Sequence, residues 1–213
     1  MAFGAFKPLN TEQKTVLEVL TNDKIRVVVL TGASGSGKTI LSLAAYLASY
    51  KNFGNGAMIS RLMVDVGRAL GTLPGFAEEK LDPYLICFDH NLSTLTSMPI
   101  RKARDYYKIK PVPIQLLRGA SMVDCFVIID EAQMLSEHEL LTIGTRISKG
   151  SKLVLLGDLA QVDGGRNNKA LITLVKHPKF IASPIAKHLH LSKTVRGKVT
   201  ELFMEVFPGE ENE

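Results

Sequence analysis

Residues 27–39 read Val-Val-Val-Leu-Thr-Gly-Ala-Ser-Gly-Ser-Gly-Lys-Thr. The opening run of β-branched residues is typical of a buried strand. It leads directly into Gly32-Ala33-Ser34-Gly35-Ser36-Gly37-Lys38-Thr39, which matches the Walker A pattern G-x-x-x-x-G-K-[ST] at every position. The glycines permit a loop whose backbone N–H groups converge on an anion at the start of a helix. The stretch therefore predicts a strand, a phosphate-binding loop and a helix, in that order.

The last two residues of this loop have separate expected roles. Lys38 is expected to reach the β- and γ-phosphates of a nucleoside triphosphate as a point charge. Thr39 is expected to supply a hydroxyl to the accompanying Mg²⁺. A glycine-rich turn that merely precedes a helix is the alternative, and the complete pattern between a strand and a helix disfavours it.

A second apolar run ends in two carboxylates. Phe126-Val127-Ile128-Ile129 is followed by Asp130-Glu131, which is a Walker B arrangement. Because parallel strands deliver their carboxyl ends to one edge of a sheet, Asp130 is expected to hold Mg²⁺ opposite Thr39. Glu131 is then placed to orient and deprotonate the attacking water. The pair predicts hydrolysis of the triphosphate rather than binding alone.

Two glutamines complete the predicted site. Gln161 follows the apolar run 153–156 and is placed to sense the γ-phosphate or the attacking water, although a polar turn would explain it as well. The amide of Gln13 offers a donor and an acceptor that match the edge of adenine. A helix N-cap at Thr11 explains the same region without a ligand. ATP is preferred over GTP, because no Asp-containing motif for guanine is found.

The whole chain alternates between short β-branched runs and helical stretches. This predicts an α/β fold, a mainly parallel sheet of about five strands flanked by helices. The expected strands are 26–30, 57–60, 126–129, 153–156 and 188–191, and the expected helices are 11–20, 39–50 and 137–147. Glycines and prolines between about 62 and 113 predict an insertion at the sheet edge without long regular elements. We expect a single domain over 1–207 and a disordered acidic tail over 208–213.

Composition excludes several classes of protein. A chain that is 46% hydrophobic and 22% charged is typical of a globular protein. No apolar run approaches the roughly 18 to 20 residues of a membrane span, and the first residues do not resemble a secretory signal. Cys87 and Cys125 lie far apart without a Cys/His cluster, which indicates reduced thiols, no zinc site and a cytoplasmic location.

The charge of the chain is unevenly spread. The net charge is +5, and leaving out the four glutamates between Glu205 and Glu213 raises it to +9. A basic body suits a polyanionic partner such as nucleic acid. A solvated basic surface beside a frayed tail is equally compatible with the numbers.

Together these residues resemble the PhoH-like family of P-loop ATPases, which is related to the superfamily 1 helicase core. Beyond the phosphate loop the resemblance rests on Gln13, Arg61, Gly71-Thr72-Leu73-Pro74-Gly75, Lys80, Pro83-Tyr84, Arg118-Gly119, Asp130-Glu131-Ala132-Gln133, Thr145-Arg146, Gly150-Ser151-Lys152, Gly157-Asp158 with Gln161 and Asp163, and Val195-Arg196. Leu62 and Ser148 depart from the family pattern, which has proline and glycine there. The resemblance implies a RecA-like P-loop NTPase fold and ATP hydrolysis. Without a nuclease-like domain, the chain looks like a compact stand-alone or phage-encoded member, expected in a host cytoplasm in the latter case.

Phosphoryl transfer of this kind usually draws on an arginine at the γ-phosphate, worth about 10³ to 10⁵ in rate. Helicases of superfamily 1 take such arginines from a second lobe, for which this chain has no room. The candidates here are Arg146, before the fourth expected strand, and Arg196, after the fifth. Resemblance to ring-forming ATPases implies a homo-oligomer, with a hexameric ring favoured, in which Arg146 acts across the interface. Alternatively, Arg146 caps the carbonyls at the end of its own helix.

A surface for single-stranded RNA or DNA is also expected. Basic and aromatic side chains gather in one stretch, which comprises Arg101, Lys102, Arg104, Lys108, Lys110, Tyr106 and Tyr107. An exposed strap would explain them equally. Arg61 lies where helicase cores contact a strand, and Arg118 is assigned to the same surface or to a subunit interface. The leading hypothesis is a nucleic-acid-stimulated, helicase-like ATPase. The alternatives are an ATP-gated assembly scaffold and a small-molecule kinase.

Overall fold

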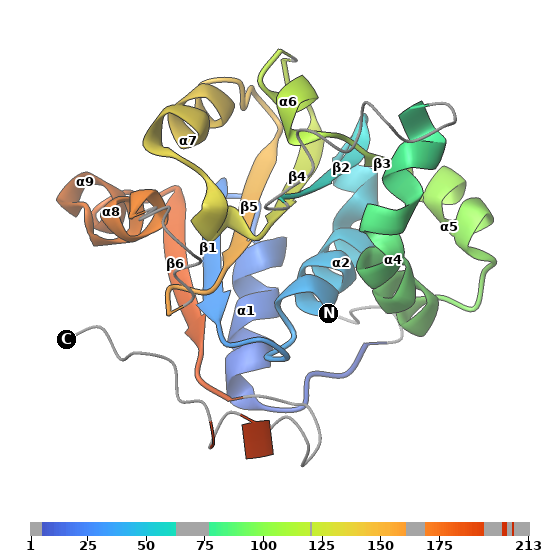
Figure 1. The fold of residues 1–213 in the computed structure, drawn as a ribbon, viewed down its shortest axis with the longest axis horizontal. Helices are drawn as coiled ribbons and strands as arrows, with labels where there is room; N and C mark the ends of the chain where they lie inside the picture. Colours follow the sequence, from blue (N-terminus) through green and yellow to red (C-terminus); the bar gives the residue numbers. More distant parts are fainter. Residues whose placement is uncertain are drawn as a thin grey trace.

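The structure is a computed structural model that describes residues 6–62, 77–119, 121–160 and 169–193, together with 202, 203 and 206, and within it residues 77–85 are described as backbone alone. Its centre is a six-stranded sheet in the order β3-β2-β4-β5-β1-β6, with all five pairings parallel. The strands are β1 (Val27–Gly32), β2 (Gly56–Arg61), β3 (Ile109–Pro111), β4 (Cys125–Asp130), β5 (Lys152–Gly157) and β6 (Ala186–Leu191). The predicted α/β fold with a mainly parallel sheet is confirmed (Figure 1).

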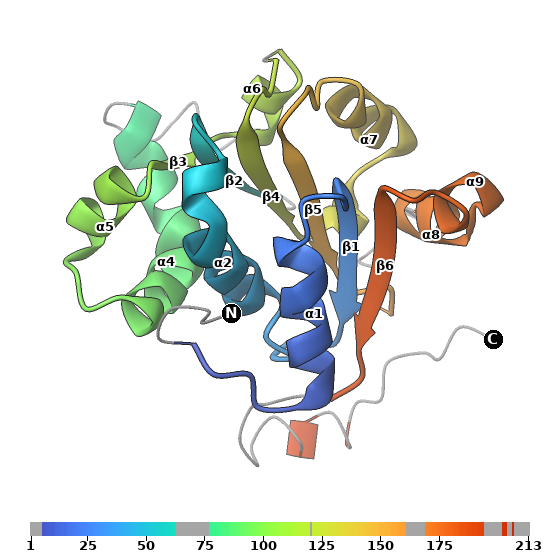
Figure 2. The ribbon, with the colours of Figure 1, turned by 180° about the vertical axis from the view of Figure 1, so that it is seen from behind.

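Helices cover both faces of this sheet (Figures 1 and 2). The described helices are α1 (Thr11–Thr21), α2 (Lys38–Ser49), α4 (Ala77–Leu95), α5 (Ile100–Tyr106), α6 (Ile114–Leu117), α7 (Glu137–Gly144), α8 (Ala170–Lys176) and α9 (Pro178–Ile181), with 3₁₀ turns at Tyr50–Asn52 and Ala132–Met134. Val28 and Leu30 of β1 pack into the core beneath α1 and α2, whereas Val29 packs into the core beneath α6, α7 and α8. Burial on both faces explains why the central strands are almost wholly apolar. None of the helices in the described part combines the length and apolar character needed to cross a membrane.

The sheet has one strand more than expected. Strand β3 is three residues long, pairs with β2 alone among the described strands and ends at Pro111. An edge strand tolerates proline because one side of its backbone needs no partner. Three residues beside a proline are too few to show the alternation of apolar and polar side chains that indicates a strand. For this reason β3 was not predicted from the sequence.

The expectation that residues 62–113 lack long regular elements is wrong. Helix α4 runs for 19 residues and includes Pro83. Its second half buries Phe88, Leu92 and Leu95, which recur at helical spacing against the core beneath α2. This packing outweighs the local signal of the glycines and prolines. Two helix ends also differ from the prediction. The N-cap of α1 is Asn10 rather than Thr11, and α7 ends at Gly144 rather than at residue 147.

A buried lysine ties the start of β5 to the end of α1. The ammonium of Lys152 donates to the carbonyls of Leu20 at 2.5 Å and Asn22 at 2.9 Å. Carbonyls at the C-terminal end of a helix have no partner within the helix, and a cation there also suits the helix dipole. Burial nevertheless lowers the pKa of Lys152 to about 8. The contact holds α1, and with it Gln13, in a defined place on the sheet.

Candidate functional site

The phosphate loop connects β1 to α2 and is shaped by two close approaches. Gly32 has φ +147°, and a Cβ at this position would lie 2.6 Å from the carbonyl oxygen of Leu191 in β6. Gly37 is the N-cap of α2 with φ +96°, and a Cβ there would lie 3.3 Å from Nε2 of Gln13. Only glycine fits both places without strain. The local sequence thus builds the predicted strand–loop–helix unit.

Lys38 is the first residue of α2, directly after this loop. Its Nζ donates to the carbonyls of Gly32 at 2.5 Å and Ala33 at 3.0 Å. Inside the loop, the hydroxyl of Ser36 is buried and makes no hydrogen bond within the described residues. A phosphate group fits such a place, because it would accept hydrogen bonds from the lysine and from the hydroxyl.

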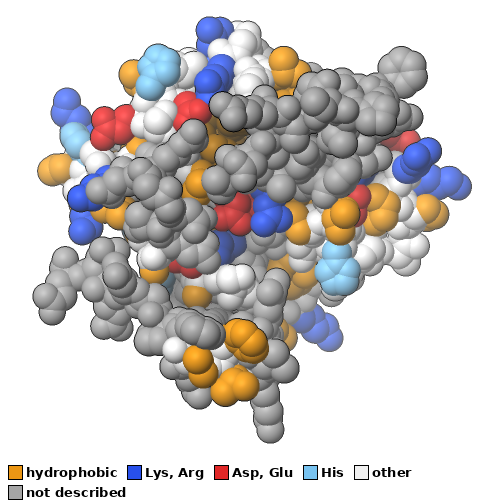
Figure 3. All heavy atoms as spheres, viewed as in Figure 1, with side chains coloured by type: hydrophobic (Ala, Val, Ile, Leu, Met, Phe, Trp, Pro, Cys, Tyr) orange, Lys and Arg blue, Asp and Glu red, His pale blue; other side chains and the backbone are white. Residues whose placement is uncertain are grey.

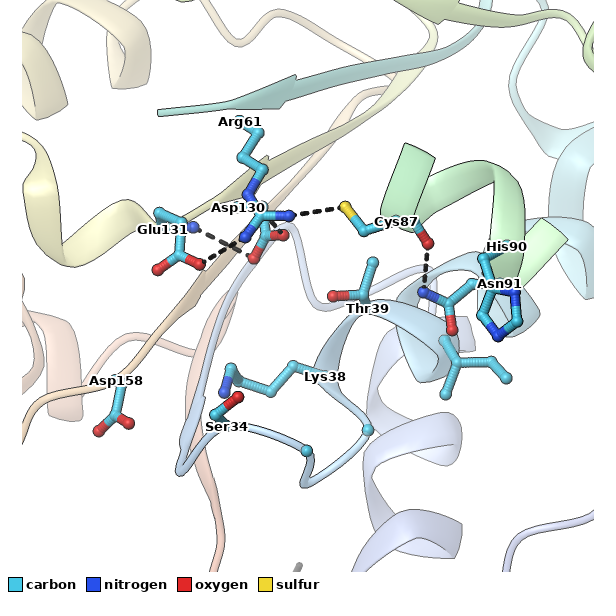
Figure 4. Close-up of a pocket in the computed structure, with 13 residues that line it drawn as sticks. Ser34, Lys38, Thr39, Arg61, Cys87, His90, Asn91, Asp130, Glu131 and Asp158 are labelled. Atoms are coloured by element: carbon cyan, nitrogen blue, oxygen red, sulfur yellow. Dashed lines mark hydrogen bonds and ion pairs between the residues drawn. The ribbon is translucent and has the colours of Figure 1, made fainter. Parts of the chain in front are cut away.

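The loop opens on a cavity of about 360 Å³ that is also lined by the ends of β2, β4 and β5 and by α4 (Figure 4). Four of the residues predicted for the site line it, namely Lys38, Thr39, Asp130 and Glu131. Asp130 is buried at the end of β4, and burial, together with the neighbouring Glu131 carboxylate, raises its pKa to about 6. A hydroxyl and a buried carboxylate are hard oxygen donors, so Thr39 and Asp130 fit Mg²⁺.

Arg61 also lies in this cavity, which the sequence did not indicate. Its Nη2 is 3.1 Å from Oε1 of Glu131, its Nε is 3.9 Å from Oδ2 of Asp130, and its Nη1 donates to Sγ of Cys87 at 2.8 Å. The register of the sheet explains this position, since Arg61 pairs directly with Asp130 across β2 and β4. A role of Arg61 in binding nucleic acid therefore stays a prediction. These side-chain contacts of Arg61 within the chain are all with residues that line this cavity.

Gln133 is a second residue that contacts the candidate site and had no predicted role. It is buried, and its Nε2 donates to Oε2 of Glu131 at 2.8 Å while its Oε1 accepts from the backbone N–H of Asp158 at 3.2 Å. It therefore links the end of β4 to the end of β5. The signal was present in the sequence as the last residue of Asp-Glu-Ala-Gln, but its partner on β5 is visible only in the fold.

Gln13 is buried next to the phosphate loop. Its Oε1 accepts from the N–H of Leu9 at 2.8 Å, and its backbone N–H donates to Oδ1 of Asn10 at 2.9 Å. The side chain thus shapes the start of α1 and lies beside Gly37 at the same time. Recognition of adenine by this amide stays a prediction.

Of the three remaining predicted catalytic residues, the structure describes one, Arg146. Gln161 and Arg196 lie outside the described residues. Arg146 is exposed, and its carbonyl accepts from the N–H of Met122, which precedes β4 at the end opposite Asp130. Within the described part of the chain its guanidinium makes no hydrogen bond or ion pair. Arg146 therefore does not reach the pocket of its own chain, and capping of α7 by its side chain has no contact to support it.

The basic residues assigned to nucleic acid fall into two groups. Arg101 and Lys102 are exposed on α5. Arg104 instead forms a two-pronged ion pair with Asp89, and Arg118 pairs with Glu139 of the α7 capping box. On the face shown in Figure 3, the described Lys and Arg side chains stand in separate groups rather than in one patch. A continuous basic surface is not visible among the described residues of this face.

A phosphate loop after β1 and an acidic end of β4, adjacent at one edge of a parallel sheet, define a RecA-like P-loop NTPase fold. The family model described as "PhoH-like protein" matches residues 5–208. The chain belongs to the PhoH-like family.

Curated relatives are similar over most of this chain. Protein PhoH2 of Bacillus subtilis is 36% identical over 206 residues, covering 92% of this chain and 46% of that protein. Protein PhoH2 of Mycolicibacterium smegmatis is 31% identical over 208 residues, covering 94% and 48%. The chain thus spans about half the length of these relatives.

Among solved structures, the large terminase of a thermophilic bacteriophage in complex with ADP has a TM-score of 0.54 at 12% identity. The match covers 95% of this chain and 51% of that one. At this identity the likeness supports the fold alone.

Proposed function

We propose that this protein binds ATP with Mg²⁺ in the pocket at the phosphate loop and hydrolyses it. The observation that carries the proposal is the convergence of Lys38, Thr39, Asp130 and Glu131 on one cavity from separate parts of the chain. These are the groups that phosphoryl transfer to water requires: a phosphate cradle, ligands for the metal and a base.

Each residue has a defined task in this reaction. Lys38 would exchange the carbonyls of Gly32 and Ala33 for phosphate oxygens. Thr39 and Asp130 would hold Mg²⁺, which shields the negative charge of the phosphates. Glu131 would accept a proton from the attacking water while the water oxygen bonds to the γ-phosphorus and the bond to the β-phosphate oxygen breaks. The choice of ATP over GTP rests on Gln13, which is buried beside the loop.

We further propose that single-stranded nucleic acid stimulates this hydrolysis. The proposed location of the protein is the cytoplasm. The support is the basic body of the chain and the exposed pair Arg101 and Lys102, which share helix α5 with the exposed ring of Tyr106. Exposed cations and aromatic rings on one element suit a flexible polyanion whose bases can stack.

The proposal includes a homo-oligomer, with a hexameric ring favoured. An apolar groove of about 550 Å³ lies between α7 and the α8–α9 pair, and Thr145, the neighbour of Arg146, lines it. Leu141, which is 65% exposed, lies in this groove beside Leu140 and Leu174, and a contiguous apolar surface is typical of contacts between proteins. A second subunit that covers the groove would bring Arg146 close to an interface, as an arginine acting in trans requires.

Phosphate release from ATP tests the proposal. Wild-type protein should release phosphate with Mg²⁺, faster when single-stranded RNA or DNA is added, and the variants Lys38→Ala and Glu131→Gln should not. Tight ATP binding without turnover would support the scaffold alternative instead. Transfer of the phosphate to a metabolite would support the kinase alternative. Specific activity that stays constant on dilution through subunit dissociation would contradict a trans-acting arginine.

A further inference from the structure

The guanidinium of Arg61 connects the proposed base to helix α4. It approaches Glu131 at 3.1 Å with one nitrogen and Cys87 of α4 at 2.8 Å with another. Its third nitrogen lies 3.9 Å from Asp130. Figure 4 shows the guanidinium between these side chains, above the phosphate loop. Arg61 is thus placed between the two acids and a helix that forms the opposite wall.

Both carboxylate oxygens of Glu131 are engaged in this arrangement. Oε1 pairs with Arg61, and Oε2 accepts from Nε2 of Gln133 at 2.8 Å. A general base must direct one oxygen at the attacking water, at about 2.6–3.2 Å. Oε1 is instead directed at Arg61 while Gln133 holds Oε2, so in the observed arrangement the ion pair with Arg61 keeps Oε1 from the attacking water.

The same guanidinium is placed to bind the end of a triphosphate. Arg61 and Lys38 line the same cavity, and the Arg61 side chain is 32% exposed, so part of it opens on that space. A guanidinium binds phosphate with two parallel hydrogen bonds, and a phosphate carries more negative charge than a carboxylate. A cation held by Asp130 would in addition compete with Arg61 for that carboxylate. Both effects draw Arg61 away from Glu131 when a triphosphate is bound.

We propose that Arg61 senses the triphosphate and positions Glu131: it exchanges the Glu131 carboxylate for the terminal phosphate and so releases Glu131 to face the attacking water. This inference rests on the proposed function, because it requires ATP in this pocket. It also places one phosphate-binding arginine within the chain itself, in addition to any that a neighbouring subunit supplies.

Nucleotide affinities test the exchange without reliance on turnover. Calorimetry would compare adenylyl imidodiphosphate, a non-hydrolysable ATP analogue, with ADP, both with Mg²⁺. Arg61→Ala should weaken binding of the analogue by about tenfold and change ADP binding by less than about twofold, since a charge-assisted contact to the terminal phosphate alone is lost. Arg61→Lys keeps the positive charge but lacks the two parallel N–H donors of a guanidinium. It should reduce the affinity for the analogue less than Arg61→Ala does, and leave ADP binding unchanged.

A double-mutant cycle tests the link to Glu131. Glu131→Gln should tighten binding of the analogue several-fold, because Arg61 is no longer held by a charge, and this gain should vanish in the Arg61→Ala background. Arg26→Ala is the matched control: Arg26 is half-buried just before β1, at the opposite end of that strand from the loop, and should change neither affinity.

Four results would overturn the inference. An equal loss of affinity for the analogue and ADP would make Arg61 a structural residue. Additive effects in the cycle would exclude the exchange with Glu131. Wild-type protein that binds neither nucleotide would overturn the proposed function together with this inference, whereas tight binding that does not depend on Arg61 would overturn this inference alone.

Discussion

Gln133, in the 3₁₀ turn that follows β4, donates from its amide nitrogen to Glu131, while its amide oxygen accepts from the backbone N–H of Asp158. The hydrogen bond between Nε2 of Gln133 and Oε2 of Glu131 is 2.8 Å long. Because Gln133 is itself bound to Asp158, which follows β5, the orientation of the proposed base depends on a neighbouring strand. Glu131 itself adopts a left-handed backbone conformation with φ +58°, which is uncommon for a residue with a side chain. The position of the base is therefore set by contacts outside its own strand.

Replacing Gln133 by alanine should lower kcat for ATP by about tenfold with little change in KM, because the base loses one of the groups that orient it. The N–H of Asp158 also loses its acceptor, so the free energy of unfolding should fall by about 1–3 kcal/mol. Steady-state kinetics and urea unfolding would measure the two effects. Unchanged kcat in a folded variant would contradict the positioning role of Gln133.

Gly157→Ala should act on the site through Gln133. A Cβ at Gly157 would lie 2.8 Å from a methyl group of Leu171 and 3.0 Å from Oε1 of Gln133. Overpacking of this kind costs about 1–3 kcal/mol, and it should displace the glutamine and slow hydrolysis. Gly54→Ala is the control, since a Cβ there meets nothing within 4 Å. Equal melting temperatures of the two variants would contradict the prediction.

Asp130→Asn should stabilise the protein and abolish Mg²⁺-dependent hydrolysis. The pKa of Asp130 is raised to about 6 in the folded protein, above the value of about 3.9 for an unfolded chain. The folded state is therefore penalised when Asp130 ionises, by roughly 1–3 kcal/mol at pH 7, and this penalty disappears as the pH falls from about 6 to about 4.

Denaturant unfolding without nucleotide or Mg²⁺ would measure this difference. At pH 7 the asparagine variant should have the larger free energy of unfolding, and at about pH 4 the two proteins should be equal. A wild-type protein that is the more stable of the two at pH 7 would show that Arg61 and Lys38 outweigh the burial of Asp130.

Leu141→Glu should reduce the mass of the proposed oligomer, because it places a charge in the apolar groove between α7 and α8. Analytical ultracentrifugation over a range of concentrations would measure the mass, and ATP hydrolysis should fall with it. Leu116→Glu is the control, since Leu116 on α6 is 63% exposed and lies outside the groove. The same oligomeric mass for wild-type protein and the Leu141 variant would exclude this groove as the interface.

Much of the fold could be predicted from the sequence because its signals are local. The phosphate loop is a continuous run in which the glycines suit a backbone that other residues would strain, and the apolar runs of β4 and β5 identify buried strands by themselves. Asp130 and Glu131 were predictable for the same reason, since they follow such a run directly. Strand β3 and helix α4 were not, because their stability comes from pairing and packing with distant residues.

The sequence by itself therefore determined the phosphate loop, the two acids and the parallel α/β architecture. Only the tertiary structure decided what surrounds them. Arg61 enters the pocket because the register of β2 and β4 places it level with Asp130, and Arg104 and Arg118 pair with Asp89 and Glu139 because their helices meet in space. Register and helix contacts join residues far apart in the chain, so no local pattern of residue types records them.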